Sequence, residues 1–224
     1  MQFVPFTPAT LASELAGWVD RRVERLRFES NPGNPQPGRV FGFDGAPEVG
    51  TAELADRVAE VLRGVGRPVL RASTDSWWRP AALRLELGRQ DVDMLLTGWV
   101  DVAALRRELF GPVAAGTGTF ITRLRDPVTD RPIRQPAAPT PPGAVLLLDG
   151  PFLLAAELPL EALVGVQVST RTVRRGLAAE NSWWAAGFER YEREYRPSER
   201  ADVLLAYDHP RAPAAAGLPD DARR

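Results

Sequence analysis

The chain has 224 residues, of which 44% are hydrophobic, and a formal net charge of −1. This length and composition suffice for the core of a single α/β domain, and the near-neutral charge argues against an extended nucleic acid as partner. The absence of cysteine excludes disulfides, cysteine-bound zinc and thiol catalysis, and all 28 basic side chains apart from histidine are arginine.

The first predicted element is a helix from Pro8 to Leu26. Thr7 can cap it, Pro8 takes the first helical position, and its apolar residues fall on one face. The turn-rich connector 31–38 separates this helix from the first predicted strand. No signal-peptide pattern is evident, and the apolar region 144–168 is too interrupted to span a bilayer, so we expect a cytoplasmic protein with no membrane partner.

A strand, a glycine-containing loop and a helix come after the connector. The strand is predicted at 39–44, the loop runs through Gly50, and the helix ends near Gly64. A second strand is predicted at 68–73, with Asp75 just beyond its carboxyl end. The later predicted elements are a helix at 101–110, a loop-rich region at 111–142, strands at 144–148 and 163–168, an interrupted helix at 171–193 and a strand at 202–206.

Strands that are apolar throughout and alternate with helices predict a mainly parallel sheet covered on both faces. We therefore expect an α/β three-layer sandwich, with an N-terminal helix at 1–30, the main domain at 39–208 and a flexible tail at 209–224. Ligands of such sheets bind outside the carboxyl ends of the strands. The loop 45–50, Asp75 and Asp149 all come directly after strands, so we expect them to line one crevice.

The segment FGFDGAPEVGTA has the frame of a phosphate-binding P-loop. In the pattern G-x-x-x-x-G-K-[ST], backbone N–H groups cradle phosphates, the lysine reaches the β- and γ-phosphates, and the hydroxyl holds Mg²⁺. Here Gly45 and Gly50 form the frame, Thr51 takes the lysine position, and Ala52 takes the hydroxyl position. Any contact with phosphates is therefore made without a P-loop lysine.

From the P-loop frame onward, the order of motifs resembles that of uridine kinase-like P-loop nucleoside kinases. The similar segments are RASTDSWWRPAALRLELGR (71–89), GWVDVAALRRELFGPV (98–113), LRDPVTDRPI (124–133), AVLLLDGPFLLAAEL (144–158) and ADVLLAYDHP (201–210). The resemblance covers roughly Arg39 to Pro210. It implies a P-loop NTPase-like fold, Mg-ATP as cofactor, a small nucleoside or nucleotide as partner, and association into homo-oligomers.

The resemblance also assigns roles to individual residues. Asp75 would activate the nucleoside hydroxyl, and Asp149 would lie near the metal and the phosphates. The remaining assignments are Gly45, Gly50, Thr51, Arg174 and Arg175 for the nucleotide, and Trp77, Arg84 and Asp101 for the acceptor.

Several departures from the family pattern concern phosphate handling. In the loop, Pro47 removes one backbone donor, Glu48 adds a negative charge, and Val49 replaces a small residue. Ala155-Ala156 stands where an arginine is expected, and Ala179-Glu180 stands near the place of an Arg-Asp pair. A different arginine could replace the lysine, and the candidates are Arg79, Arg84, Arg89, Arg123, Arg174 and Arg175.

Structural roles compete with these assignments. Asp75 could cap the following segment, and Asp149 could accept bonds from its own turn. Adjacent tryptophans, here 77–78 and 183–184, are more often core residues than stacking platforms. His209, the single histidine, is not expected to be catalytic.

Three functions stay open at this stage. The first is a weak or specialised kinase that phosphorylates a nucleoside-like hydroxyl. The second is a non-catalytic pseudokinase that binds a nucleotide or nucleoside, or regulates a partner. The third is a different reaction built on the acceptor pocket.

Overall fold

The structure is a computed structural model that describes residues 2–28 and 36–218. The connector predicted at 31–38 lies mostly outside the described residues. The main strands are β2 (Arg39–Asp44), β3 (Val69–Ser73), β6 (Val145–Gly150), β7 (Ala162–Gln167) and β8 (Val203–Ala206), joined at one edge by β9 (Ala214–Ala216) and β1 (Val4–Pro5). The longer helices are α1 (Pro8–Phe28), α2 (Thr51–Gly64), α6 (Thr170–Gly176) and α7 (Trp184–Tyr195).

Shorter elements connect these. They are the 3₁₀ turns η1 (Pro47–Val49), η2 (Thr74–Trp77) and η5 (Ala179–Asn181), the π-helical turns η3 (Met94–Gly98) and η4 (Arg106–Phe110), the helices α3 (Ala81–Arg84), α4 (Val102–Leu105), α5 (Gly111–Ala115) and α8 (Pro197–Arg200), and the small hairpin of β4 (Thr119–Phe120) and β5 (Ala138–Pro139).

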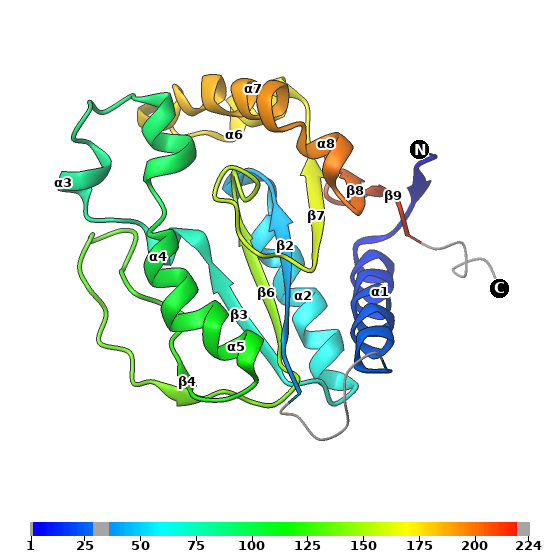
Figure 1. Ribbon diagram of the computed structural model, residues 1–224. Helices are drawn as coiled ribbons and strands as arrows, with labels where there is room; N and C mark the ends of the chain where they lie inside the picture. Colours follow the sequence, from blue (N-terminus) through cyan, green and yellow to red (C-terminus); the bar gives the residue numbers. More distant parts are fainter. Residues whose placement is uncertain (1, 29–35, 219–224) are drawn as a thin grey trace.

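The seven-stranded sheet has the order β1-β9-β8-β7-β2-β6-β3. The five strands from β8 to β3 are mutually parallel, β9 pairs antiparallel with β8, and β1 pairs antiparallel with β9. Helices α1 and α2 cover one face, α4 and α5 cover the other, and α6 and α7 cross the carboxyl ends of the strands (Figure 1). The predicted α/β fold with a mainly parallel sheet is confirmed.

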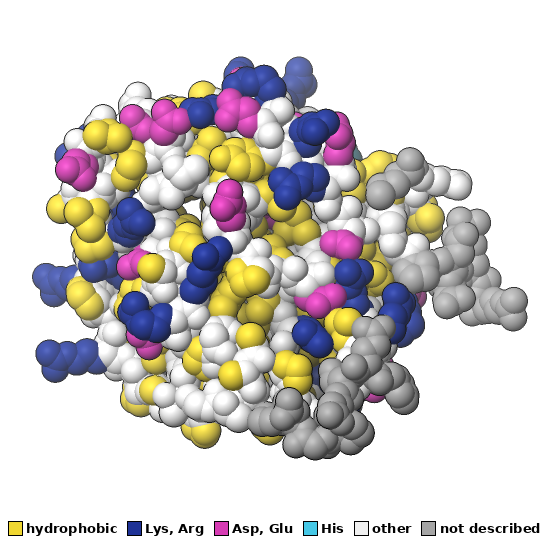
Figure 2. Space-filling view, viewed as in Figure 1, with side chains coloured by type: hydrophobic (Ala, Val, Ile, Leu, Met, Phe, Trp, Pro, Cys, Tyr) yellow, Lys and Arg dark blue, Asp and Glu magenta, His cyan; other side chains and the backbone are white. Residues whose placement is uncertain are grey.

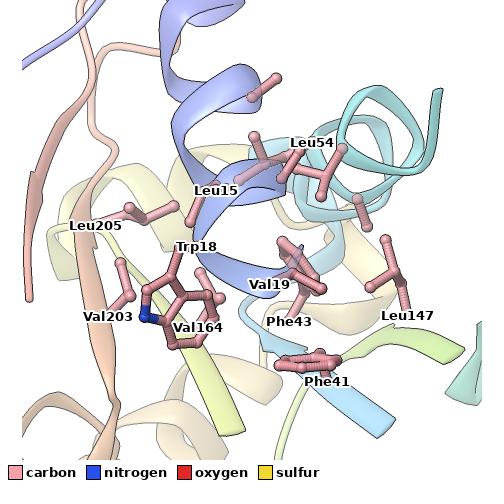
Figure 3. Close-up of a cluster of buried hydrophobic side chains, with 14 of the residues drawn as sticks. Leu15, Trp18, Val19, Phe41, Phe43, Leu54, Leu147, Val164, Val203 and Leu205 are labelled. Carbon is pink, nitrogen blue, oxygen red and sulfur yellow. The ribbon is translucent and has the colours of Figure 1, made fainter. Parts of the chain in front are cut away.

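The core on the first face joins the N-terminal helix to the sheet. Leu15, Trp18 and Val19 of α1 are buried and point toward the strands (Figure 3). The indole of Trp18 meets the ring of Phe41 edge-on at 6.0 Å between centroids. Since one buried cluster includes side chains of α1, α2 and the central strands, the N-terminal helix folds as part of the main domain.

The expected flexible tail contains a strand. Residues 214–216 form β9, which pairs with β8, and β1 pairs with β9 in turn. Ala215 and Ala216 are buried, and Gly217 has a left-handed backbone with φ of 92°. The alanines carry little strand signal of their own, so the edge of the sheet supplies the order that their sequence does not predict.

Candidate functional site

Strand pairing brings the predicted site residues to one edge of the sheet. β2 and β6 pair so that Phe43 lies opposite Asp149, and β3 pairs with β6 so that Ser73 lies opposite Asp149. The backbone N–H of Gly45 donates to the carbonyl of Gly150 at 3.3 Å. The start of the loop and the end of β6 are therefore directly joined at the carboxyl ends of the strands, where ligands of parallel sheets bind.

The loop 45–50 lies between β2 and α2, but several of its backbone groups bond within the loop. The N–H of Val49 donates to the carbonyl of Ala46 at 3.3 Å, and that of Gly50 donates to the carbonyl of Pro47 at 3.5 Å. Pro47 has no N–H to offer. Gly50 adopts φ of 84°, which favours glycine. The loop thus forms a 3₁₀ turn that uses two donors internally and lacks a third.

Thr51, at the position of the P-loop lysine, is 1% exposed. Its hydroxyl donates to the carbonyl of Ala46 at 3.2 Å. A Cβ on Gly45 would lie 2.7 Å from this hydroxyl oxygen, so the threonine packs directly beneath the loop. In this conformation the Thr51 side chain stabilises the loop from inside instead of pointing toward a ligand.

A half-buried arginine that was not among the predicted site residues lies beside the loop. Arg71 on β3 is 16% exposed, and its guanidinium bonds the Asp149 carboxylate at 2.8 Å and the Asp56 carboxylate at 2.8 Å. One of its nitrogens also lies 3.4 Å from the carbonyl oxygen of Ala52. The hydroxyl of Ser73 donates to the second oxygen of Asp149 at 3.0 Å. Both oxygens of Asp149 therefore have protein partners.

Burial raises the pKa of Asp149, and the neighbouring Arg71 opposes that rise. The residues around Asp149 do not fit a Mg²⁺ site, because its oxygens are engaged and Ala52 has no hydroxyl. Within 2–28 and 36–218, no group of three or more Asp, Glu, His or Cys side chains could hold a metal.

The other two predicted carboxylates have local partners. Asp75 is half-buried in η2, and its carboxylate accepts a bond from the Ser76 hydroxyl at 3.1 Å. Asp101 caps α4 by accepting the N–H of Ala104 at 2.9 Å. Of these two carboxylates, Asp75 lies near Asp149, because its negative charge contributes to the raised pKa of Asp149.

The space beyond Asp75, where the resemblance predicts an acceptor, contains four packed indoles. The Trp99 ring lies 5.2 Å from Trp78, 5.2 Å from Trp184 and 6.1 Å from Trp183, all edge-on. Arg84 stacks against this group, with its guanidinium carbon 4.9 Å from Trp78 and 4.8 Å from Trp99. The cavity next to them measures only about 20 Å³, about the space of one water molecule.

The structure uses two of the predicted acceptor residues internally. Trp77 is fully buried, and its indole N–H donates to the carbonyl of Thr122 at 3.1 Å. Arg84 is 7% exposed and also bonds the carbonyl of Arg79 at 2.7 Å and the Asp130 carboxylate at 3.1 Å. In this conformation both side chains contact protein rather than an open pocket.

The two predicted arginines of α6 are exposed. Arg174 pairs with Glu189 of α7 at 2.8 Å, and Arg175 lies on the surface next to it. Helix α6 packs against η1, so both arginines belong to a helix that contacts the loop. The structure does not bring either guanidinium into contact with Gly45, Gly50 or Thr51.

Asp44, at the end of β2, is a second buried carboxylate besides Asp149. It was not among the predicted site residues. It is 5% exposed and accepts a hydrogen bond from the Tyr191 hydroxyl and bonds from the backbone N–H groups of Phe152 and Leu153. Burial raises its pKa to about 7. An acidic residue at the end of an otherwise apolar strand was the sequence signal for this site.

The surface carries both signs of charge. Basic and acidic side chains are interspersed on the face in Figure 2, without a continuous patch of either sign. Among the described residues, no helix combines the length and hydropathy needed to cross a membrane.

Comparison with solved structures gives the same fold. A possible uridine kinase from Bacillus stearothermophilus superposes with a TM-score of 0.59 at 21% identity, covering 83% of this chain and 98% of the other. D-glycerate 3-kinase from Cryptococcus neoformans superposes with a TM-score of 0.57 at 13% identity, covering 88% of this chain and 94% of the other. No protein-family model and no curated protein matches the sequence. The similarity thus shows a fold shared with P-loop small-molecule kinases.

Proposed function

We propose that this chain is a uridine kinase-like P-loop protein with a degenerate phosphate loop, in which phosphoryl transfer is lost and small-molecule binding or regulation remains. The observation that carries the proposal is the ion pair of Arg71 and Asp149 at 2.8 Å. It occupies the edge of the sheet where the resemblance expects a metal and phosphates.

The electrostatics of the loop support this proposal. Phosphoryl transfer depends on positioning and on stabilising the charge of the transferring group, so loss of one preorganised cation or donor costs about 10²–10³-fold in rate. Here Thr51 replaces the lysine and Ala52 replaces the hydroxyl. Val49 and Gly50 use their N–H groups within the loop. The combined loss in the rate of phosphoryl transfer is larger than one compensating substitution elsewhere would restore.

A second candidate is a specialised kinase in which Arg71 replaces the lysine and Asp75 is the base. The observation that favours it is the Arg71 guanidinium nitrogen 3.4 Å from the carbonyl oxygen of Ala52, beside the loop. This candidate requires Arg71 to leave Asp149 when a nucleotide binds. For either candidate we propose a cytoplasmic protein, with homo-oligomers as the expected form.

Phosphoryl transfer from radiolabelled ATP separates the two candidates. The purified protein is incubated with Mg²⁺ and a panel of nucleosides, sugars and glycerate, and Asp75→Asn serves as the matched variant. We expect no labelled product from either protein. Labelled product from the native chain that disappears in a folded Asp75→Asn variant would establish the kinase and overturn our proposal.

A further inference from the structure

A larger cavity lies apart from the indoles, where β2 and β7 end beneath α7. Its volume is about 280 Å³, near the lower end of small-molecule sites, which begins at about 300 Å³. The start of the loop 45–50, the end of β7 and one face of α7 line it. The α7 residues in the lining are Ala185, Phe188, Glu189, Tyr191 and Glu192, so that each has another of the set three or four positions away on the helix.

The charged side chains that line this cavity are all acidic. Asp44 is buried, whereas Glu189 and Glu192 are exposed and mark its open side. Within the described part of the chain, the lining contains no arginine or histidine. The negative charge of Glu192 reaches Asp44 and opposes its ionisation. Such a cavity repels phosphate and attracts a cation.

Basic side chains are close to the cavity but outside its lining. Arg174 pairs with Glu189 at 2.8 Å, and both side chains are exposed. The positive charge of Arg200 opposes the rise that burial causes in the pKa of the Tyr191 hydroxyl. Asp44 and Glu192 have no arginine bonded to them among the described residues. Above the raised pKa of Asp44, about 7, the charge of both carboxylates is therefore available to a ligand.

Apolar side chains form another part of the lining, beside the polar groups of Gln167, Ser169, Thr170, Tyr191 and Ser198. The apolar side chains are Val166, Val168, Val173, Phe188 and Leu204. These side chains suit a hydrocarbon or aromatic body. As no described cluster of Asp, Glu, His and Cys could hold a metal, the lining fits an organic cation better than a metal ion.

Asp44 retains room for one more hydrogen bond. An ionised carboxylate has about four acceptor sites. Tyr191 and the two backbone N–H groups of Phe152 and Leu153 occupy three, which leaves one for an ammonium N–H. Glu192 accepts from the Ser198 hydroxyl through one oxygen, so its other oxygen is open to a second contact.

We propose that this cavity binds a small organic ammonium ion with an apolar body, held by the carboxylates of Asp44 and Glu192 and by the Phe188 ring. The inference rests on the proposed function, because it names the ligand class of a chain that binds without transferring phosphate.

Titration calorimetry tests whether binding requires a positive charge. It uses three probes that share a phenyl ring with one attached carbon and differ in the charge of their polar group. The probes are benzylammonium, benzyl alcohol and benzoate, and the full-length protein is used at about pH 8, above the raised pKa of Asp44. We expect saturable binding of benzylammonium, binding of benzyl alcohol weaker by at least about tenfold, and no binding of benzoate. Equal binding of benzylammonium and benzyl alcohol, or no benzylammonium binding at millimolar concentration, would overturn the proposal.

Variants on α7 test the location. Glu192→Gln should weaken benzylammonium at least about tenfold, and Asp44→Asn should weaken it further. Glu194→Gln is the matched control, because Glu194 lies on the same helix outside the lining and pairs with Arg190. Glu192→Gln allows the test even where Asp44→Asn fails to fold. Equal affinity of Glu192→Gln and Glu194→Gln would contradict the assigned site.

The outcomes for the two proposals are separable. Absence of benzylammonium binding, with no phosphoryl transfer, would remove the ammonium site and leave the non-catalytic proposal standing. Labelled product in the transfer assay would remove the non-catalytic proposal regardless of the amine titration.

Discussion

Arg71→Met is expected to lower the free energy of unfolding by about 3–5 kcal/mol, the usual cost of breaking a buried ion pair from one side. Arg71 is 16% exposed and Asp149 is 6% exposed, so water can solvate little of the carboxylate that remains. The variant also loses bonds to the carbonyls of Leu147 and Ala72. Urea denaturation followed by circular dichroism measures the change.

Two controls make the Arg71 result specific. In Arg71→Met/Asp149→Asn the uncompensated charge is absent, so more than half of the lost stability should return. Arg63→Met removes an exposed guanidinium that bonds the carbonyl of Val69, and it should have little effect. An Arg71→Met variant as stable as Arg63→Met would show that the ion pair does not stabilise the fold.

The stability contributed by Asp44 is expected to fall as the pH rises from about 4 to about 7. Burial raises the pKa of this carboxyl from 3.8 to about 7, so the folded state holds its proton over a range where the unfolded state has lost it. The free energy of unfolding therefore decreases with pH in this window and levels off above it. The full change is about 4 kcal/mol at most, from 1.36 kcal/mol per pKa unit.

Asp44→Asn isolates this contribution from that of other carboxylates. Its side chain does not titrate, so the difference in unfolding free energy between the native chain and the variant should follow the Asp44 proton. Tyr191 and Glu192 are the titratable groups that act on Asp44, and both remain in the variant. A difference that stays constant between pH 4 and 7 would contradict the raised pKa of Asp44.

Much of the parallel sheet could be predicted from the sequence, because its strands are short apolar runs with no alternation. β2 has the predicted bounds, 39–44, and β6 to β8 begin or end within two residues of the predicted positions. The strands β1 and β9 were not predicted. Their residues, Val4–Pro5 and Ala214–Ala216, become strands only because the sheet offers an open edge next to β8.

The site was harder to predict because its decisive contacts are long-range. Arg71 and Asp149 are 78 positions apart in the sequence, and Asp44 and Tyr191 are 147 positions apart. Whether each pair meets depends on strand register and on the placement of α7. The loop substitutions at Thr51 and Ala52 were visible in the sequence. How Thr51 packs beneath the loop and how Trp99 joins three other indoles depend on packing alone.

The central proposal is a degenerate phosphate loop, from which we infer that the loop does not hold a nucleoside triphosphate, and a thermal-unfolding titration with Mg-ATP tests this inference most directly. A ligand at about 100 times its dissociation constant stabilises the native state by about 2.7 kcal/mol, which is a rise of a few degrees in a domain of this size. We predict a cooperative transition with no saturable rise up to millimolar Mg-ATP. A saturable rise that Gly50→Val abolishes would contradict the inference, since it would place the nucleotide on the loop.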